Sequence, residues 1–264
     1  MSDDRRGDFT HQAGAYAKAR PEYPPQLIRD LFNLVGVTPE DLVADVGAGT
    51  GISSRQLADA GLRVIAVEPN AAMRAAAAED PRITWMDGTF EATGLEAERV
   101  AWVVAAQAFH WADPPRALPE LRRVLRPAAA FTALWNDRDY EHSPLLMFAK
   151  ELITRFSPDF DEGYKHRDWA NILVSTGDFE SVVETTATHA IRAPKSRFLD
   201  LWRSHNTLNV AIGRDGVAKM LAEIDAAWPR FADADGLSTI AYVAKAWTVW
   251  RAGGRVGSYP RRLG

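Results

Sequence analysis

Three glycines at alternate positions follow a short apolar run that carries an acidic residue near its end. The run is Leu42 to Val46, and Asp45 is the acidic residue. The glycines are Gly47, Gly49 and Gly51. Because glycine lacks a Cβ, a ligand can approach the backbone here and the chain can take a positive φ. Residues 52–61 have the pattern of a helix, whose N-terminus offers unpaired N–H groups. The stretch therefore predicts a ligand-binding turn between a strand and a helix.

A second carboxylate helps to identify the ligand. Glu68 ends the next predicted strand, about 20 residues after Gly47, where such a carboxylate accepts hydrogen bonds from ribose hydroxyls. The pyrophosphate-binding turn of dinucleotide enzymes needs the spacing G-x-G-x-x-G, but Ile52 occupies the sixth position here. Asp45 would also repel a pyrophosphate, whereas it suits a ligand with an ammonium or sulfonium cation. Spacing and charge therefore favour S-adenosylmethionine over a nicotinamide dinucleotide.

Alternating strand and helix patterns predict the elements that hold this turn. Strands are predicted over residues 41–46, 63–67, 82–86, 100–106 and 128–134, and helices over 26–34, 52–61, 71–79 and 114–125. The alternation with short connections predicts an open parallel α/β sheet with right-handed crossovers. After Trp135 the pattern becomes mainly helical. Helices are predicted over 145–156, 169–176, 196–205 and 215–228, and strands over 179–190 and 238–250.

These patterns divide the chain into four parts of one structural domain. Residues 1–40 are an N-terminal arm and helix that form a lid, and residues 41–135 are the cofactor-binding core. Residues 136–236 are a helical cap that includes strand six of the sheet at about 179–190, and residues 237–264 are the last strand and tail. No long Gly/Ser linker and no internal repeat separates these parts.

Composition excludes several classes of function. Apolar residues make up 47% of the 264 residues and charged residues 25%, as in ordinary globular proteins. A formal net charge of −4 does not indicate a nucleic-acid partner. Without cysteine there is no thiolate metal site, and His142 and His166 lack metal-ligand spacing, so no metal is expected. No apolar run approaches the ~18 residues of a membrane span, and no signal peptide begins the chain. We therefore expect a cytoplasmic protein without a membrane partner.

Four segments, in this order and spacing, resemble class I S-adenosylmethionine-dependent methyltransferases. They are Val43-Ala44-Asp45-Val46-Gly47-Ala48-Gly49-Thr50-Gly51, Val67-Glu68-Pro69, Gly88-Thr89-Phe90-Glu91-Ala92 and Ala106-Gln107-Ala108-Phe109-His110-Trp111. Within that family the chain looks most like the small-molecule branch, methyltransferase type 11, which includes trans-aconitate methyltransferase-like proteins. Tyr16 with Arg20 to Pro24, and the segment Arg203 to Leu208, are similar to that branch as well.

The resemblance implies a fold and an activity. The fold is a Rossmann-like sheet of seven strands, mostly parallel with an antiparallel last strand, plus a helical cap inserted after strand five. The activity is methyl transfer from S-adenosylmethionine to a small molecule, whose acceptor group can be a carboxylate, hydroxyl, amine or carbon. We expect a monomer or homodimer that binds a small-molecule substrate and no nucleic acid.

The resemblance also assigns cofactor contacts. Asp45 lies near the methionine ammonium, Glu68 binds the ribose hydroxyls, and Tyr16 and Arg20 close over the cofactor. The complete implied set is Tyr16, Arg20, Asp45, Gly47, Ala48, Gly49, Gly51, Glu68, Pro69, Thr89, Phe90, Gln107 and Ala108. Phe90 departs from the branch, which more often has a small residue there.

Methyl transfer from a sulfonium mainly needs alignment and exclusion of water, and it needs a base only when the acceptor must lose a proton. His110, at the end of a predicted strand, is one candidate base because its ordinary pKa is near neutral; the alternative is a packed histidine bonded to backbone. His205 is a second catalytic candidate, and with Arg203 it can meet an anionic acceptor. Further candidate substrate contacts are Trp111, Trp135 and Arg138.

Three other functions stay open at this point. One is an enzyme that directs attack to another carbon next to the sulfonium. A second is a non-enzymatic protein that binds S-adenosylmethionine or S-adenosylhomocysteine. The third is a nicotinamide dehydrogenase, which the glycine spacing opposes.

Overall fold

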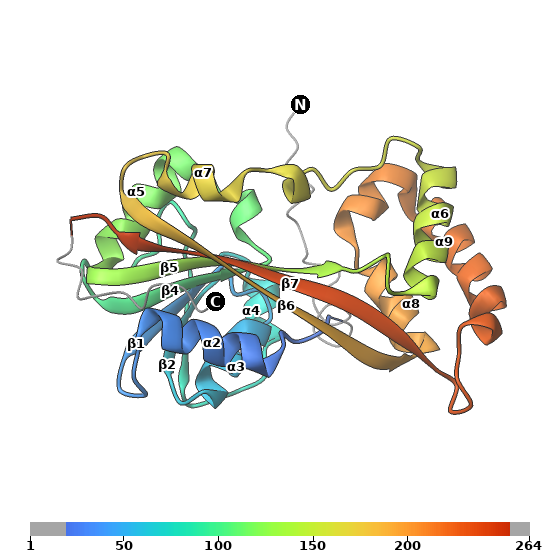
Figure 1. The fold of residues 1–264 in the computed structure, drawn as a ribbon, viewed down its shortest axis with the longest axis horizontal. Coiled ribbons are helices and arrows are strands. Elements are labelled where there is room, and N and C mark those ends of the chain that lie inside the picture. Colours follow the sequence, from blue (N-terminus) through green and yellow to red (C-terminus); the bar gives the residue numbers. More distant parts are fainter. Residues whose placement is uncertain (1–19, 254–264) are drawn as a thin grey trace. The chain divides into compact units, whose positions relative to one another are not determined.

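The computed structural model describes residues 20–253, and their strands form one sheet in the order β3-β2-β1-β4-β5-β7-β6 (Figure 1). β1 pairs in parallel with β2 and β4, β2 with β3, and β4 with β5. β7 is antiparallel to β5 and β6. The predicted seven-stranded Rossmann-like sheet is therefore confirmed. The strands are β1 (Leu42–Val46), β2 (Arg63–Val67), β3 (Ile83–Met86), β4 (Val100–Ala106), β5 (Leu125–Arg138), β6 (Phe179–Pro194) and β7 (Leu237–Arg251).

The helices begin and end at the signals that the chain carries. Pro25 occupies the first turn of α2, and Gly36 ends that helix with a φ of 70°. The side chain of Asn70 accepts hydrogen bonds from two backbone N–H groups at the start of α4. The helices are α2 (Pro25–Val35), α3 (Ile52–Asp59), α4 (Ala71–Ala75), α5 (Pro114–Val124), α6 (Pro144–Phe156), α7 (Trp169–Val174), α8 (Lys195–Arg203) and α9 (Asn206–Ala227), with short 3₁₀ turns η1 (Phe109–Trp111), η2 (Tyr164–His166) and η3 (Trp228–Arg230).

Three elements differ in length from the sequence-based expectation. α4 ends at Ala75 rather than at residue 79. β5 extends from Leu125 to Arg138, and pairing in the sheet therefore continues beyond the apolar run that predicted it. α9 begins at Asn206, nine residues before the predicted start at residue 215. Gly213 has a non-helical φ of 70° inside α9, and this kink explains why the sequence pattern marks only its second half.

The described chain consists of two compact units. We call residues 22–136, 168–187 and 244–253 the parallel-sheet unit, and residues 20–21, 137–167 and 188–243 the cap unit. β5, β6 and β7 contribute residues to both units. The sequence-based division into four parts of a single domain stays a prediction.

Helices cover both faces of the sheet in the parallel-sheet unit. α2 and α3 lie on one face, and α5 and α7 lie on the other (Figure 1). Leu27 of α2 and Leu57 of α3 are buried in the same core as Val43 of β1. Because β4 is covered on both sides, its apolar residues Val100 to Ala105 are all buried, as expected of a central parallel strand.

The cap unit has its own apolar core. Leu146 of α6, Trp202 of α8 and Met220 of α9 are fully buried in it, together with Tyr242 near the middle of β7. Within residues 20–253, the structure contains no helix that is both long and apolar enough to cross a membrane.

Candidate active site

The glycine turn after β1 needs glycine for two reasons. Gly47, Gly49 and Gly51 have φ values of 73°, 58° and 77°, which other residues rarely adopt. A Cβ on Gly47 would also lie 2.6 Å from the Cβ of Ala108 and 3.1 Å from the ring of Phe90. The N–H groups of Gly47 and Ala48 both donate to the carbonyl of Val67, at 2.8 and 3.1 Å. The turn is therefore tied to the end of β2 and packed against the segment that follows β4.

Asp45 lies at the end of β1 and is completely buried. Its Oδ2 accepts hydrogen bonds from the hydroxyls of Ser53 and Ser54, both at 2.6 Å, in the first turn of α3. Its Oδ1 has no hydrogen-bond partner. Burial raises the pKa of Asp45 to about 6, although the hydrogen bonds from the two serine hydroxyls act to lower it. One oxygen therefore holds the helix, and the other remains available to a ligand.

Glu68 joins two turns at the carboxyl ends of β1 and β2. Its Oε2 accepts the N–H of Gly49 and its Oε1 accepts the N–H of Asn70, both at 2.9 Å. Burial raises the pKa of this carboxyl, and the two backbone N–H groups oppose the rise. A carboxylate has about four acceptor positions, so the two that remain can accept ribose hydroxyls.

Gln107 follows β4 and has an unusual backbone conformation, with a φ of 56°. Its N–H donates to the carbonyl of Leu134 at 2.7 Å, and its Nε2 donates to the carbonyl of Asn136 at 3.3 Å. Its Oε1 is buried without a hydrogen-bond partner. Since β1 and β4 are adjacent parallel strands, Asp45 and Gln107 stand at the point where strand order reverses, which is where ligands bind in open α/β sheets.

Thr50 is a site residue that the sequence reasoning did not single out. It lies between two of the glycines, is 1% exposed, and its Oγ has no hydrogen-bond partner. Its place inside the glycine motif is the signal that could have identified it. An unpartnered buried hydroxyl is costly unless a ligand or water completes it.

The surroundings of Phe90 accommodate a large ring at a position where the similar methyltransferases more often have a small residue. Its ring packs against Gly47 and meets the ring of Phe109 edge-on, with centroids 5.4 Å apart. The ring is therefore an apolar wall beside the glycine turn. Thr89 and Pro69 are exposed, and the N–H of Thr89 donates to the carbonyl of Ala92 at 3.0 Å.

His110 lies in η1, within a group of aromatic side chains. Its Nδ1 accepts the indole N–H of Trp135 at 3.3 Å, and its ring lies 4.7 Å from that of Trp111. Trp135 is buried and stacks on Trp169 at 4.3 Å, whereas Trp111 is 43% exposed. An imidazole that accepts at Nδ1 carries its proton on Nε2 when it is neutral, so His110 presents a donor there.

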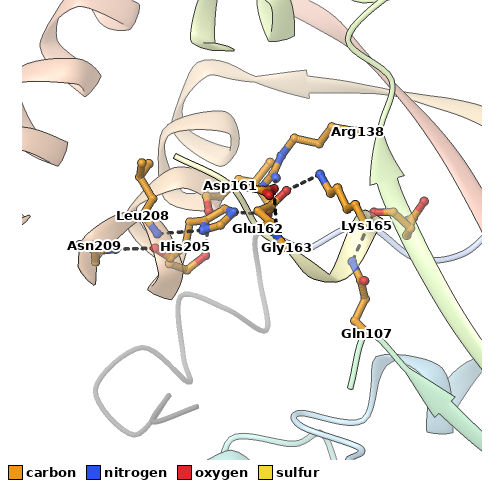
Figure 2. Close-up of polar contacts among 12 residues, drawn as sticks. Gln107, Arg138, Asp161, Glu162, Gly163, Lys165, His205, Leu208 and Asn209 are labelled. Atoms are coloured by element: carbon orange, nitrogen blue, oxygen red, sulfur yellow. Dashed lines mark hydrogen bonds and ion pairs between the residues drawn. The ribbon is translucent and has the colours of Figure 1, made fainter. Parts of the chain in front are cut away.

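The remaining candidates belong to the cap unit, where the structure brings Arg138 and His205 together around Glu162 (Figure 2). Nothing in the sequence pattern singles out Glu162, which lies in a polar loop. Arg203 does not join them, because its guanidinium pairs with Asp200 at 2.7 Å and is half-exposed.

Both ring nitrogens of His205 are used. Nε2 donates to Glu162 at 2.8 Å, and Nδ1 accepts the N–H of Leu208 at 3.3 Å, which caps α9. Burial lowers the pKa of His205 to about 4, although the hydrogen bond to Glu162 acts to raise it. The ring is therefore neutral at neutral pH. This arrangement favours a structural role, and a role for His205 in catalysis stays a prediction.

Of the two predicted lid residues, Tyr16 lies outside the described part of the chain. Arg20 is described, and its carbonyl accepts a hydrogen bond from Arg197 at 3.4 Å. Within residues 20–253, no group of three or more His, Asp or Glu side chains could hold a metal ion.

Comparison with known proteins gives consistent results. Residues 44–133 match the description of a methyltransferase domain. An uncharacterized methyltransferase of Mycobacterium tuberculosis is 42% identical over 135 residues, which cover 50% of this chain and 53% of the relative. A probable S-adenosylmethionine-dependent methyltransferase of Saccharomyces cerevisiae is 25% identical over 226 residues, 75% of each chain. A solved structure from Anaeromyxobacter dehalogenans, provisionally named a type II methyltransferase, is 28% identical, with a TM-score of 0.57 over 88% of this chain and 97% of its own.

The chain spans about half the length of the Mycobacterium relative. The match to the methyltransferase domain, over residues 44–133, includes the glycine turn, Glu68 and the segment after β4. The strand order matches the α/β fold of solved methyltransferase structures. Residues 44–133 are therefore similar to a methyltransferase domain, and over this part the chain resembles the class I S-adenosylmethionine-dependent methyltransferases.

Proposed function

We propose that this protein transfers the methyl group of S-adenosylmethionine to a small-molecule acceptor, and that the acceptor carries a carboxylate. The observation that carries the proposal is a pair of buried acceptor atoms without partners, Oδ1 of Asp45 and Oε1 of Gln107. They stand at the carboxyl ends of β1 and β4, beside a turn that has no room for a Cβ at Gly47. Buried acceptors of this kind suit a ligand that brings a cation and hydrogen-bond donors.

The residues of the parallel-sheet unit fit this cofactor. Ionised Asp45 would hold its ammonium group, and Glu68 would accept its ribose hydroxyls with the positions that the backbone leaves open. Gln107 and Thr50 would complete its polar contacts, while the ring of Phe90 would cover an apolar portion. When bound, S-adenosylmethionine supplies a methyl group on a sulfonium that its positive charge has already activated.

The surroundings of His110 support an acceptor that needs no base. Its Nδ1 accepts the N–H of Trp135 at 3.3 Å, so this ring nitrogen is already used as an acceptor and is poorly placed to take a proton from a substrate. A carboxylate is already ionised at neutral pH and therefore needs no base.

Two measurements test the proposal. Isothermal titration with S-adenosylmethionine, S-adenosylhomocysteine and NAD should show binding of the first two only. Incubation with methyl-labelled cofactor and a panel of small carboxylates, alcohols and amines should then yield labelled product with at least one carboxylate. Tight binding of NAD alone would refute the cofactor assignment.

The panel also distinguishes the alternatives. A non-enzymatic binding protein would bind S-adenosylmethionine without forming S-adenosylhomocysteine from any acceptor. Transfer to amines or alcohols with none to carboxylates would leave the methyltransferase activity in place and refute the acceptor class.

A further inference from the structure

Arg138, Trp202 and Tyr242, all in the cap unit, each have a buried hydrogen-bond donor without a partner among the described residues. The atoms are Nε of Arg138, Nε1 of Trp202 and the hydroxyl of Tyr242. Trp202 is completely buried, Tyr242 is 2% exposed, and the side chain of Arg138 is 6% exposed. Buried donors nearly always have partners in folded proteins, because each unsatisfied one costs about 1–3 kcal/mol and a charged one costs more.

Glu162 does not satisfy Arg138, because other groups already use this carboxylate. Glu162 receives the Nε2–H of His205 at 2.8 Å on Oε1, and Lys165 forms an ion pair with Oε2 (Figure 2). The distance from Nη1 of Arg138 to Oε1 of Glu162 is 3.8 Å, which is too long for a hydrogen bond. The guanidinium instead lies over the ring of Trp202, with Cζ 4.2 Å from the centroid. Its hydrogen-bonding edge is therefore left without a carboxylate.

Charge in this region favours an anion. Burial raises the pKa of Tyr242, and the charges of Arg138, Arg20 and Arg197 act against that rise. Three guanidinium groups thus lie within electrostatic reach of one buried phenol. His205 is neutral, and the charge of Glu162 is matched by that of Lys165. The side chain of Arg138 is buried, and the low polarity of its surroundings strengthens its attraction for an anion.

We propose that Arg138, Trp202 and Tyr242 form a binding site for the oxyanion of a small molecule, either a carboxylate or a phosphate. The planar guanidinium binds two oxygens of such a group at once, and the indole N–H and phenol O–H complete the set of donors. The inference goes beyond the proposed methyl transfer, because it concerns the cap unit alone and requires no cofactor.

Two substitutions test the site. Trp202→Phe replaces the indole by a smaller ring without an N–H, and Tyr242→Phe removes only the phenol O–H, while each keeps an aromatic ring in the core. Trp228→Phe is the matched control, because Trp228 lies in the same core but its N–H already donates to the carbonyl of Gly236 at 3.2 Å. Arg138→Lys is a third test, since it keeps the charge and removes the planar donor edge.

The probes are succinate, inorganic phosphate and the neutral analogue succinamide, titrated calorimetrically into the full chain without cofactor. We expect succinate or phosphate to bind and succinamide not to bind. Trp202→Phe, Tyr242→Phe and Arg138→Lys should each weaken that binding about tenfold or more, and Trp228→Phe should leave it unchanged. Tighter binding of succinate would indicate a carboxylate ligand, and tighter binding of phosphate would indicate a phosphate ligand. The proposal is overturned if neither anion binds, if succinamide binds equally well, or if both Phe variants bind like the original protein.

Chemical denaturation of the ligand-free variants provides a second measure that a purely structural role would not give. Tyr242→Phe should not lower the free energy of unfolding, because the hydroxyl has no partner to lose. Trp228→Phe should lower it, because a hydrogen bond disappears. A clear loss of stability in Tyr242→Phe would show that its hydroxyl is already bonded inside the protein, and would contradict the proposed site.

Discussion

At the scale of single residues, the two oxygens of Asp45 have different surroundings, which support a structural role for one and the proposed ligand contact for the other. Oδ2 holds the first turn of α3 through two serine hydroxyls, and Oδ1 has no partner. The carboxyl must be ionised to attract an ammonium group, and burial raises its pKa to about 6. Cofactor affinity should therefore be nearly complete at about pH 7, fall by half at about pH 6, and decrease by about tenfold between pH 7 and pH 5.

Titration calorimetry from pH 5 to 8 measures this dependence. Asp45→Asn should bind S-adenosylmethionine at least tenfold more weakly at pH 7, and its affinity should not vary between pH 5 and pH 7. An unchanged pH profile in Asp45→Asn would assign the titration to another group.

Glu68 makes the second residue-scale prediction. If its open acceptor positions bind the ribose, Glu68→Ala should weaken S-adenosylmethionine binding by roughly 1–3 kcal/mol. Asp87→Ala is the matched control, because Asp87 is a nearby carboxylate whose side chain is 74% exposed. Equal affinity of Glu68→Ala and the original protein in calorimetry would remove the ribose assignment.

At the scale of elements, the site depends on how the β1–α3 turn packs against the segment after β4. Gly36 and Gly47 both have positive φ values near 70°, but only Gly47 would clash if it gained a Cβ. Gly36→Ala should therefore cost only the backbone strain of about 1–2 kcal/mol. Gly47→Ala should cost that strain and about 1–3 kcal/mol more, because the Cβ must displace Ala108 or Phe90. Urea denaturation of the two variants measures the difference, and equal losses would mean that the contact with the segment after β4 is loose.

At the scale of the whole molecule, the parallel-sheet unit and the cap unit each contain buried polar atoms without hydrogen-bond partners. Asp45 and Gln107 in the parallel-sheet unit each have a buried acceptor oxygen without a hydrogen-bond partner, and Arg138 and Tyr242 in the cap unit each have a buried donor without one. Acceptors suit the cationic end of a cofactor, and donors suit an anion. These groups support the different ligands that we propose for the two units.

Hydrogen exchange can test this assignment of ligands to units. S-adenosylmethionine at 100 times its Kd should stabilise the parallel-sheet unit by about 2.7 kcal/mol and slow exchange in β1 and β4. Succinate or phosphate should instead slow exchange near Arg138, at the end of α8 and around Tyr242 in β7. Protection by S-adenosylmethionine confined to the cap unit would contradict the assignment.

The sequence by itself determined the cofactor turn and the fold around it, because both rest on local signals. The spacing of Gly47, Gly49 and Gly51 is a local pattern, and so is the alternation of strands and helices that defines the sheet. Parallel strands place their carboxyl ends at one edge, and the sequence could therefore predict that Asp45 and Glu68 lie close together.

Only the tertiary structure decided which polar groups remain unsatisfied. Arg138 ends β5, Trp202 lies in α8 and Tyr242 lies in β7, and no sequence period connects them. The sequence paired Arg203 with His205 because they are neighbours, but in the fold Arg203 bonds Asp200 and His205 bonds Glu162. Whether a buried donor has an acceptor depends on distances between segments far apart in the chain. Those distances are set by packing, and packing is the information that local sequence patterns do not contain.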